Sequence, residues 1–355
     1  MNSVSYQEWL LYGQTIHYIF VFIGAVTFLV VSYSKRIPKN ANAAVAMLFI
    51  FCIAAIGNWP DIQNSGGDKF NYYMGALDAS NGFDALGTND FGFAVLTKLC
   101  VSILPLDCYF YILALIYVGG IWLFSKSLTK DYHWLIFIAM ILNFMFIAYG
   151  TNTIRAGIAM SLVLMGIASR RKFIISVILF AIAISIHKSF ALPVACYLIA
   201  KYKDNTRLYF AIWLLSIPLS AVAGGFFQTW FATLIDDGRS SYLTVNALDT
   251  HYHVGFRIDF ILYSCVPIFL GYYYIYKRKF QDAFYKNLYN MYILANTSWI
   301  LVIRSNFSDR FAFLSWFIYS AVLIYPLLKC PHIVPNARQW LSCIVLGLTL
   351  FFAFI

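Results

Sequence analysis

The chain has 355 residues, of which 61% are hydrophobic and 11% are charged, and its mean hydropathy is +0.73. A typical soluble domain carries about 25% charged residues. A water-soluble fold of this size could not hide so much apolar surface. The composition therefore excludes a soluble enzyme and a disordered chain. The net charge of +10 fits a polytopic membrane protein with basic cytoplasmic loops, and it does not indicate a nucleic-acid partner.

Twelve apolar runs predict one integral membrane domain over residues 1–355, folded as an all-α helix bundle of about 12 spans. Several runs are shorter than the roughly 20 residues that a straight span needs. A further run, 91–104, carries Lys98 and is only moderately apolar. The twelve runs are 10–34, 42–57, 108–125, 133–149, 154–169, 172–187, 189–200, 207–223, 257–276, 287–303, 311–328 and 339–355.

Six basic clusters between these runs set the predicted orientation. All six fall on one side if the first span runs from outside to inside and 91–104 does not cross. The positive-inside rule makes that side cytoplasmic. The segment 91–104 is then a re-entrant or interfacial segment, both termini lie outside, and two long outer loops cover about 58–107 and 224–256. The first run is expected to anchor the chain rather than be cleaved.

Five basic residues stand at the predicted outer ends of spans, where the orientation rule does not explain them: Arg155, Lys188, Arg257, Arg304 and Arg310. A charge near lipid costs roughly 2.5–3.5 kcal/mol on insertion scales and usually serves function. Guanidinium groups hold phosphate oxygens in bidentate fashion. The set therefore predicts an outward-facing cavity for a lipid-linked phosphate or pyrophosphate. The alternative is snorkelling to headgroups, or pairing within the segment, such as Arg257 with Asp259 and Arg310 with Asp309.

The remaining outer-face candidates are less specific. His187 ends one run, and His251 and His253 lie in the second outer loop; each is either a proton acceptor or a plain structural histidine. Two histidines are too few for a zinc site, so neither a metal nor another cofactor is expected. Tyr72 and Tyr73 could stack on sugar rings or belong to the interfacial aromatic belt. Lys69, Lys98 and Arg239 are interpreted as ordinary loop charges.

The stretch Asn152-Thr-Ile-Arg155-Ala-Gly-Ile-Ala, followed by a basic turn and Ile186-His187-Lys188-Ser189, resembles the core of the EpsG/Wzy-like family. These are bacterial polysaccharide polymerases, including O-antigen polymerases. Asp68-Lys-Phe-Asn-Tyr72-Tyr73 and Asn89-Asp90-Phe-Gly92-Phe resemble upstream family segments, and Asp309-Arg310-Phe resembles a late one. The resemblance covers about residues 60–330. Asp90 stands where Glu is common, which leaves its role open.

The resemblance implies a metal-independent glycosyltransferase of the bacterial inner (plasma) membrane whose active site faces the periplasm or exterior. The donor would be a growing glycan on undecaprenyl pyrophosphate, and the acceptor would be one repeat unit on the same lipid. A chain-length regulator protein is a candidate further partner. Arg155, Lys188, Arg257, Arg304 and Arg310 would bind pyrophosphate; Asp68, His187, His251 and His253 would act as base or orient substrate; Tyr72, Tyr73, Asp90 and Asp309 would contact glycan.

Three competing functions stay open at this point, one of them a membrane acyltransferase, whose histidine would need a supporting catalytic set that the sequence does not reveal. An O-antigen ligase would share the arginines and the outer loops. A lipid-linked oligosaccharide flippase or transporter usually has internal repeats and charges near the membrane midplane. No repeat is evident in this sequence, and its unexpected charges gather at one predicted face, which disfavours transport.

Overall fold

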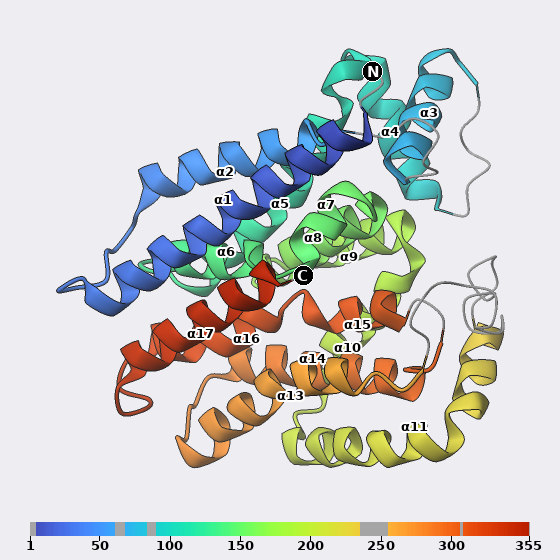
Figure 1. Cartoon of the computed structure of the whole chain (residues 1–355). Coiled ribbons are helices and arrows are strands. Elements are labelled where there is room, and N and C mark those ends of the chain that lie inside the picture. Colours follow the sequence, from blue (N-terminus) through green and yellow to red (C-terminus); the bar gives the residue numbers. More distant parts are fainter. Residues whose placement is uncertain (1–4, 61–67, 84–89, 235–254, 306–307, 355) are drawn as a thin grey trace. The chain divides into compact units, whose positions relative to one another are not determined.

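The computed structural model describes residues 5–60, 68–83, 90–234, 255–305 and 308–354 (Figure 1). Within these ranges every regular element is a helix, which confirms the predicted all-α class. The chain divides into two compact units, here called unit 1 (residues 1–190 and 327–355) and unit 2 (residues 191–326). The expectation of a single membrane domain stays a prediction.

Unit 1 is built around α5 and α8, which pack closely against each other. Helix α9 packs on α8, α2 packs on α5, and the first helix of the chain, α1, runs beside the last, α17 (Figure 1). The elements of unit 1 are α1 (Tyr6–Tyr33), α2 (Asn42–Gly57), α3 (Asp68–Ser80), α4 (Phe91–Ile103), η2 (Leu106–Cys108), α5 (Tyr109–Leu128), α6 (His133–Ile141), α7 (Met145–Thr151), α8 (Ile154–Ala168), α9 (Phe173–Ile186), η3 (Lys188–Phe190) and α17 (Ala337–Ala353).

Small residues allow α5 and α8 to approach closely. A Cβ added at Gly120 of α5 would lie 2.5 Å from the Ser161 Cβ and 2.6 Å from the Ser161 carbonyl oxygen of α8. The Ser161 hydroxyl donates a hydrogen bond of 2.5 Å to the Tyr117 carbonyl. Close backbone contact and hydroxyl bonds of this kind hold helices together where lipid removes the hydrophobic driving force.

Unit 2 is organised around α14, which packs against α10, α11, α13 and α15. Tyr285, Tyr289, Tyr292 and Trp299 of α14 are fully buried. The elements of unit 2 are α10 (Ala191–Tyr202), α11 (Thr206–Leu234), α13 (Ile258–Tyr272), the π-helical turn η6 (Tyr273–Lys277), α14 (Ala283–Leu301), α15 (Ser308–Trp316) and α16 (Tyr319–Lys329), whose last three residues belong to unit 1.

A tyrosine of α14 compensates for a proline inside a neighbouring helix. Pro326 has no N–H, so the Val322 carbonyl four residues earlier lacks its helical donor. The Tyr285 hydroxyl donates to that carbonyl at 3.0 Å. In an apolar surrounding each backbone polar group must find a partner inside the protein. Tyr285 therefore allows the proline to stand within α16.

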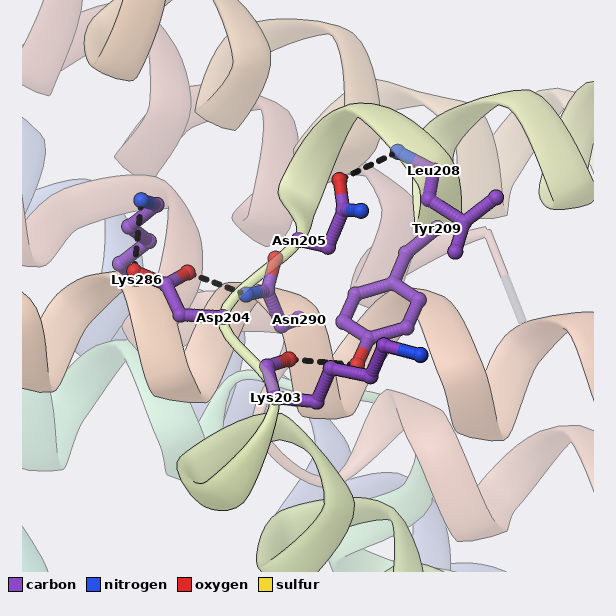
Figure 2. Close-up of polar contacts among 7 residues, drawn as sticks. All are labelled: Lys203, Asp204, Asn205, Leu208, Tyr209, Lys286 and Asn290. Carbon is purple, nitrogen blue, oxygen red and sulfur yellow. Dashed lines mark hydrogen bonds and ion pairs between the residues drawn. The ribbon is translucent and has the colours of Figure 1, made fainter.

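The turn between α10 and α11 is fastened to α14 by one carboxylate (Figure 2). Asp204 accepts hydrogen bonds from Lys286 Nζ at 2.7 Å and from Asn290 Nδ2 at 3.3 Å. The Asn205 side chain accepts from the backbone N–H of Leu208 at 3.2 Å and so caps the start of α11. Asp204 and Asn205 lie between the basic residues Lys203 and Arg207, and the sequence predicts that this turn and Lys286 face the cytoplasm.

Among the residues that the structure describes, five helical segments are long and apolar enough to cross a membrane: Tyr6–Tyr33, Leu106–Leu128, Thr206–Thr229, Ile258–Lys277 and Ser308–Lys329. A sixth is possible if α6 and α7, which are bent by 73° at the break between them, count as one span. Five more apolar helices have only 10–17 residues: α2, α4, α8, α9 and α17. The predicted count of about 12 spans is therefore not confirmed, because many of the apolar runs form helices too short for a straight crossing.

The two predicted outer loops, about 58–107 and 224–256, stay predictions. Residues 68–80 of the first form helix α3, and α11 extends into the second as far as Leu234. The segment predicted at 91–104 forms the 13-residue helix α4. Whether α4 is re-entrant or interfacial stays a prediction.

Candidate functional site

Arg155, the second residue of α8, is held by a carboxylate from far away in the sequence. Its Nη1 lies 2.9 Å from an Oδ2 of Asp90, the residue that precedes α4. The Asp90 side chain is 1% exposed, whereas the Arg155 side chain is 36% exposed. A buried carboxylate costs free energy unless it is paired, so this pair fixes both groups. Arg155 is therefore an oriented guanidinium that still reaches the surface of unit 1.

Tyr72 of α3 completes the arrangement around this arginine. Arg155 Nε donates to the Tyr72 hydroxyl at 3.3 Å, and the guanidinium carbon lies 5.7 Å from the centre of the Tyr72 ring. The other side of Tyr72 packs edge-on against Phe93 of α4, with ring centres 5.4 Å apart. Three predicted site residues, Tyr72, Asp90 and Arg155, thus meet in unit 1, from three different helices or helix starts.

Two glycines explain why these segments can approach each other. A Cβ at Gly92 would lie 2.1 Å from the Ser185 hydroxyl oxygen, 2.7 Å from the Ser185 carbonyl carbon and 2.9 Å from the Ile186 nitrogen. The start of α4 therefore rests on the end of α9, next to His187. A Cβ at Gly157 would lie 2.3 Å from the Tyr149 carbonyl oxygen, so this glycine lets α8 pack against α7.

The remaining candidate residues of unit 1 are not among the side chains that contact Arg155 in the bonds given above. His187 ends α9, is half-buried, and packs edge-on against Phe190 with ring centres 5.9 Å apart. Lys188 is exposed, and Tyr73 is half-buried on α3. Asp68 is the first residue of α3, and its side chain lies outside the described part of the structure. His251 and His253 also lie outside the described residues.

In unit 2, Arg257 forms the local pair that the sequence offered as an alternative to pyrophosphate binding. Its Nη2 lies 2.6 Å from Asp259 Oδ2 and its Nε lies 2.9 Å from Asp259 Oδ1. The guanidinium stacks on Phe260, with 3.7 Å between its carbon and the ring centre. The hydrogen bond to Asp259 raises the pKa of Arg257, against the effect of burial, and the charges of Asp259 and Asp309 add smaller contributions.

Arg304 and Arg310 stand at the helix ends nearest to Arg257 in unit 2. Arg304 Nη2 donates to the Ala221 carbonyl of α11 at 2.8 Å, beside a bend at Ala223, and its guanidinium lies 5.9 Å from the Phe256 ring. Asp309 and Arg310 begin α15, and the Asp309 charge interacts with those of Arg257 and Arg310. Within unit 2 the Asp309 charge thus interacts with both Arg257 and Arg310, and Arg304 lies near Phe256, the chain neighbour of Arg257.

Arg155 belongs to unit 1, and the other three arginines belong to unit 2. The expectation that all four surround one cavity therefore stays a prediction. Within the described ranges, no group of three or more His, Cys, Asp or Glu side chains is arranged to hold a metal ion.

One buried residue near the site was not predicted from the sequence. Lys69 of α3, interpreted as an ordinary loop charge, is only 4% exposed. Its Nζ donates to the carbonyls of Trp59 at 2.6 Å, Gly57 at 3.3 Å and Ile56 at 3.4 Å, at the end of α2. The ammonium also lies 4.5 Å above the Phe110 ring. Only its adjacency to Asp68 and Tyr72 could have drawn attention to it.

The sequence matches the EpsG family over residues 42–355, which is most of the chain. The chain belongs to the EpsG family. No curated protein and no solved structure gives a match.

As an EpsG family member with several apolar helices, the protein is a multi-pass membrane protein of polysaccharide-polymerase-like type. Three of the segments on which the resemblance rested meet in unit 1 of this EpsG family protein. The segment with Asp90 and Gly92 lies against both Arg155 and the backbone before His187, and Tyr72 contacts Arg155. The motifs of the resemblance that belong to unit 1 are therefore neighbours in space as well as in order.

Proposed function

We propose that this protein is an outward-facing polymerase that joins lipid-pyrophosphate-linked oligosaccharide repeat units into O-antigen, capsular or exopolysaccharide. The growing glycan moves from undecaprenyl pyrophosphate to the terminal hydroxyl of a lipid-linked repeat unit. The enzyme works in the bacterial inner (plasma) membrane, with its site toward the periplasm or exterior. A chain-length regulator protein is a proposed partner.

The observation that carries this proposal is the anchored guanidinium of Arg155. Asp90 and Tyr72 hold two of its nitrogens, and about a third of the side chain reaches the surface (36% exposed). A donor that is oriented before the reaction stabilises charge as it develops on a leaving group, without reorganising during the step. Pyrophosphate is a leaving group of that kind, and EpsG family membership supports the same chemistry.

The proposed reaction is one substitution at the anomeric carbon of the donor glycan. The acceptor hydroxyl oxygen forms the new glycosidic bond, the bond from that carbon to the pyrophosphate oxygen breaks, and the hydroxyl proton passes to a base. His187, which lies beside the Asp90 segment, and Asp68 are the base candidates in unit 1, and His251 and His253 are the others. Lys188, Arg257, Arg304 and Arg310 are proposed to bind pyrophosphate, and Tyr73 and Asp309 to contact glycan.

The test is a gel of surface polysaccharide from a strain deleted for this gene and complemented with variants. Deletion should reduce the ladder to single repeat units, wild-type protein should restore it, and Arg155→Ala should not. Arg36→Ala, an exposed arginine just after α1, serves as the control and should restore the ladder. Full-length polymer that is not attached to its acceptor would indicate a ligase, and lipid-linked units retained inside would indicate a flippase.

A further inference from the structure

Lys69 is a buried charged residue close to the site that has no role in the proposed reaction. A buried ammonium is costly unless its donors are satisfied. Here it lies at the carbonyl end of α2, a position that favours a cation because the helix dipole is negative there. Its bonds to Trp59, Gly57 and Ile56 join α3 to the end of α2. Its contact with Phe110 joins α3 to the start of α5.

Lys69 and Tyr72 are three residues apart on α3, so they lie on the same side of that helix. Lys69 is anchored to α2 and α5, which belong to the packed part of unit 1. Tyr72 reaches the Arg155 guanidinium. Any rotation or shift of α3 that breaks the lysine contacts would also move the Tyr72 hydroxyl away from Arg155 Nε.

We propose that Lys69 is a positioning residue of the polymerase site, which fixes α3 so that Tyr72 orients Arg155. This inference rests on the proposed function for its catalytic consequence. Its mechanical part, that Lys69 sets the place of α3, does not depend on the reaction. Lys69 itself contacts neither substrate nor reacting atoms, and it acts through Tyr72.

The first experiment measures polymerisation in membranes with a double-mutant cycle between Lys69→Met and Tyr72→Phe. Displacement of a positioned group by about 1 Å can cost about a hundredfold in rate, so Lys69→Met should lower kcat about 10- to 100-fold. Tyr72→Phe alone should lower it about tenfold. The double variant should be no slower than Lys69→Met alone, because both changes act on one interaction. Losses that multiply would overturn the proposal.

The matched control is Lys98→Met, which removes an exposed lysine from α4 of the same unit and should leave kcat unchanged. If Lys69→Met does not accumulate in the membrane, the cycle is repeated with Lys69→Arg, which keeps a cationic donor for the carbonyls. Lys69→Arg should be impaired less than tenfold and should show the same non-additivity with Tyr72→Phe. Wild-type rate in Lys69→Met would also overturn the proposal.

The second experiment separates this proposal from the proposed function. Spin labels at Asn71 of α3 and Asn152 before α8, both exposed, report the distance between the two segments. Lys69→Met should shift or broaden that distance distribution, and Lys98→Met should not. An unchanged distribution would overturn the positioning role even if the protein polymerises glycan. A changed distribution in a protein that does not polymerise would overturn only the proposed function.

Discussion

Arg155 Nη1 and Asp90 Oδ2 lie 2.9 Å apart, although 65 residues separate them in the chain. The two ends of this pair differ in exposure, since the carboxylate is 1% exposed and the arginine side chain 36%. The carboxylate therefore serves to hold and orient the arginine, and the arginine is the partner that can meet a ligand. The proposed binding of pyrophosphate in unit 1 depends on this difference in exposure between Asp90 and Arg155.

Asp90→Asn should reduce both stability and polymer formation, because it leaves the Arg155 charge without its buried counter-charge. The cost in unfolding free energy should be about 1–3 kcal/mol, less than for a fully buried pair because Arg155 is partly exposed. Thermal unfolding of the purified protein in detergent measures it. Asp259→Asn is the matched control: it removes a 60% exposed partner of Arg257 and should cost less than about 1 kcal/mol.

Asp90→Glu tests whether the negative charge alone or also the length of the side chain matters at this position. It should retain more polymer than Asp90→Asn, because the negative charge opposite Arg155 is kept. Equal loss of the ladder in both variants would show that pairing with Arg155 is not the role of Asp90.

Gly92→Ala should separate the start of α4 from the end of α9. The added Cβ would meet the backbone of Ser185 and Ile186 at 2.7 and 2.9 Å, and backbone cannot turn aside as a flexible side chain can. We expect a loss of about 1–3 kcal/mol in unfolding free energy and a loss of the polysaccharide ladder. The measurement combines thermal unfolding with the complementation gel.

The control for this change is Gly75→Ala in α3, where a Cβ meets nothing within 4 Å. Alanine favours helix over glycine by about 0.5–1 kcal/mol, so this variant should be as stable as the wild type or slightly more stable. Similar behaviour of the two alanine variants would contradict the close-packing explanation.

The sequence predicts the positions of most helices because long apolar runs are strong signals. The run 42–57 coincides with α2, and the run 154–169 corresponds to α8 (Ile154–Ala168). It does not predict the 73° bend inside the run 133–149, where apolar residues continue on both sides. Asn143, whose side chain accepts from the Met145 N–H, is a weak local signal for that break. The count of about 12 spans is not confirmed for a related reason, since hydropathy does not distinguish a short buried helix from one that crosses the membrane.

For the site, the sequence indicates which residues are candidates, but it does not predict which of them are in contact. The type and position of Arg155 and Asp90 mark them as candidates, but their pairing depends on how α4 and α8 each pack on α9, which residue spacing does not predict. The pair of Arg257 with Asp259 is predictable because it is local. Lys69 is missed because its carbonyl partners come from backbone at the end of another helix, and backbone groups leave no trace in the side-chain pattern.

The buried amide of Asn296 should be a major stabilising group of unit 2. Its oxygen accepts from Trp213 Nε1 at 2.8 Å, and its nitrogen donates to the hydroxyls of Ser264 at 3.1 Å and Ser315 at 3.0 Å. Asn296→Leu removes all three bonds and takes the acceptor away from the buried Trp213 N–H, while Ser264 and Ser315 keep their bonds to Trp316 and Ala312. Unfolding free energy should therefore fall by about 1–3 kcal/mol or more. Thermal unfolding in detergent is the measurement.

Asn290 provides a control on the same helix (Figure 2). It is also fully buried, but its amide donates a single hydrogen bond, to Asp204 at 3.3 Å, and its oxygen accepts none in the described structure. Asn290→Leu should therefore cost less than Asn296→Leu. If the two variants lose the same stability, the network around Asn296 does not have the importance given to it here.

The hydrogen bond from Tyr285 to the Val322 carbonyl should matter only because Pro326 removes the ordinary donor. Tyr285→Phe should cost about 1–2 kcal/mol of unfolding free energy in the wild-type background. In a Pro326→Ala background the new N–H at residue 326 can bond to the Val322 carbonyl, so the same change should cost clearly less.

Tyr289→Phe is the control, because the Tyr289 hydroxyl donates at 2.6 Å to the Ile268 carbonyl of α13, away from the proline. Its cost should be the same in both backgrounds. An equal cost of Tyr285→Phe with and without the proline would show that the hydroxyl does not replace the missing donor.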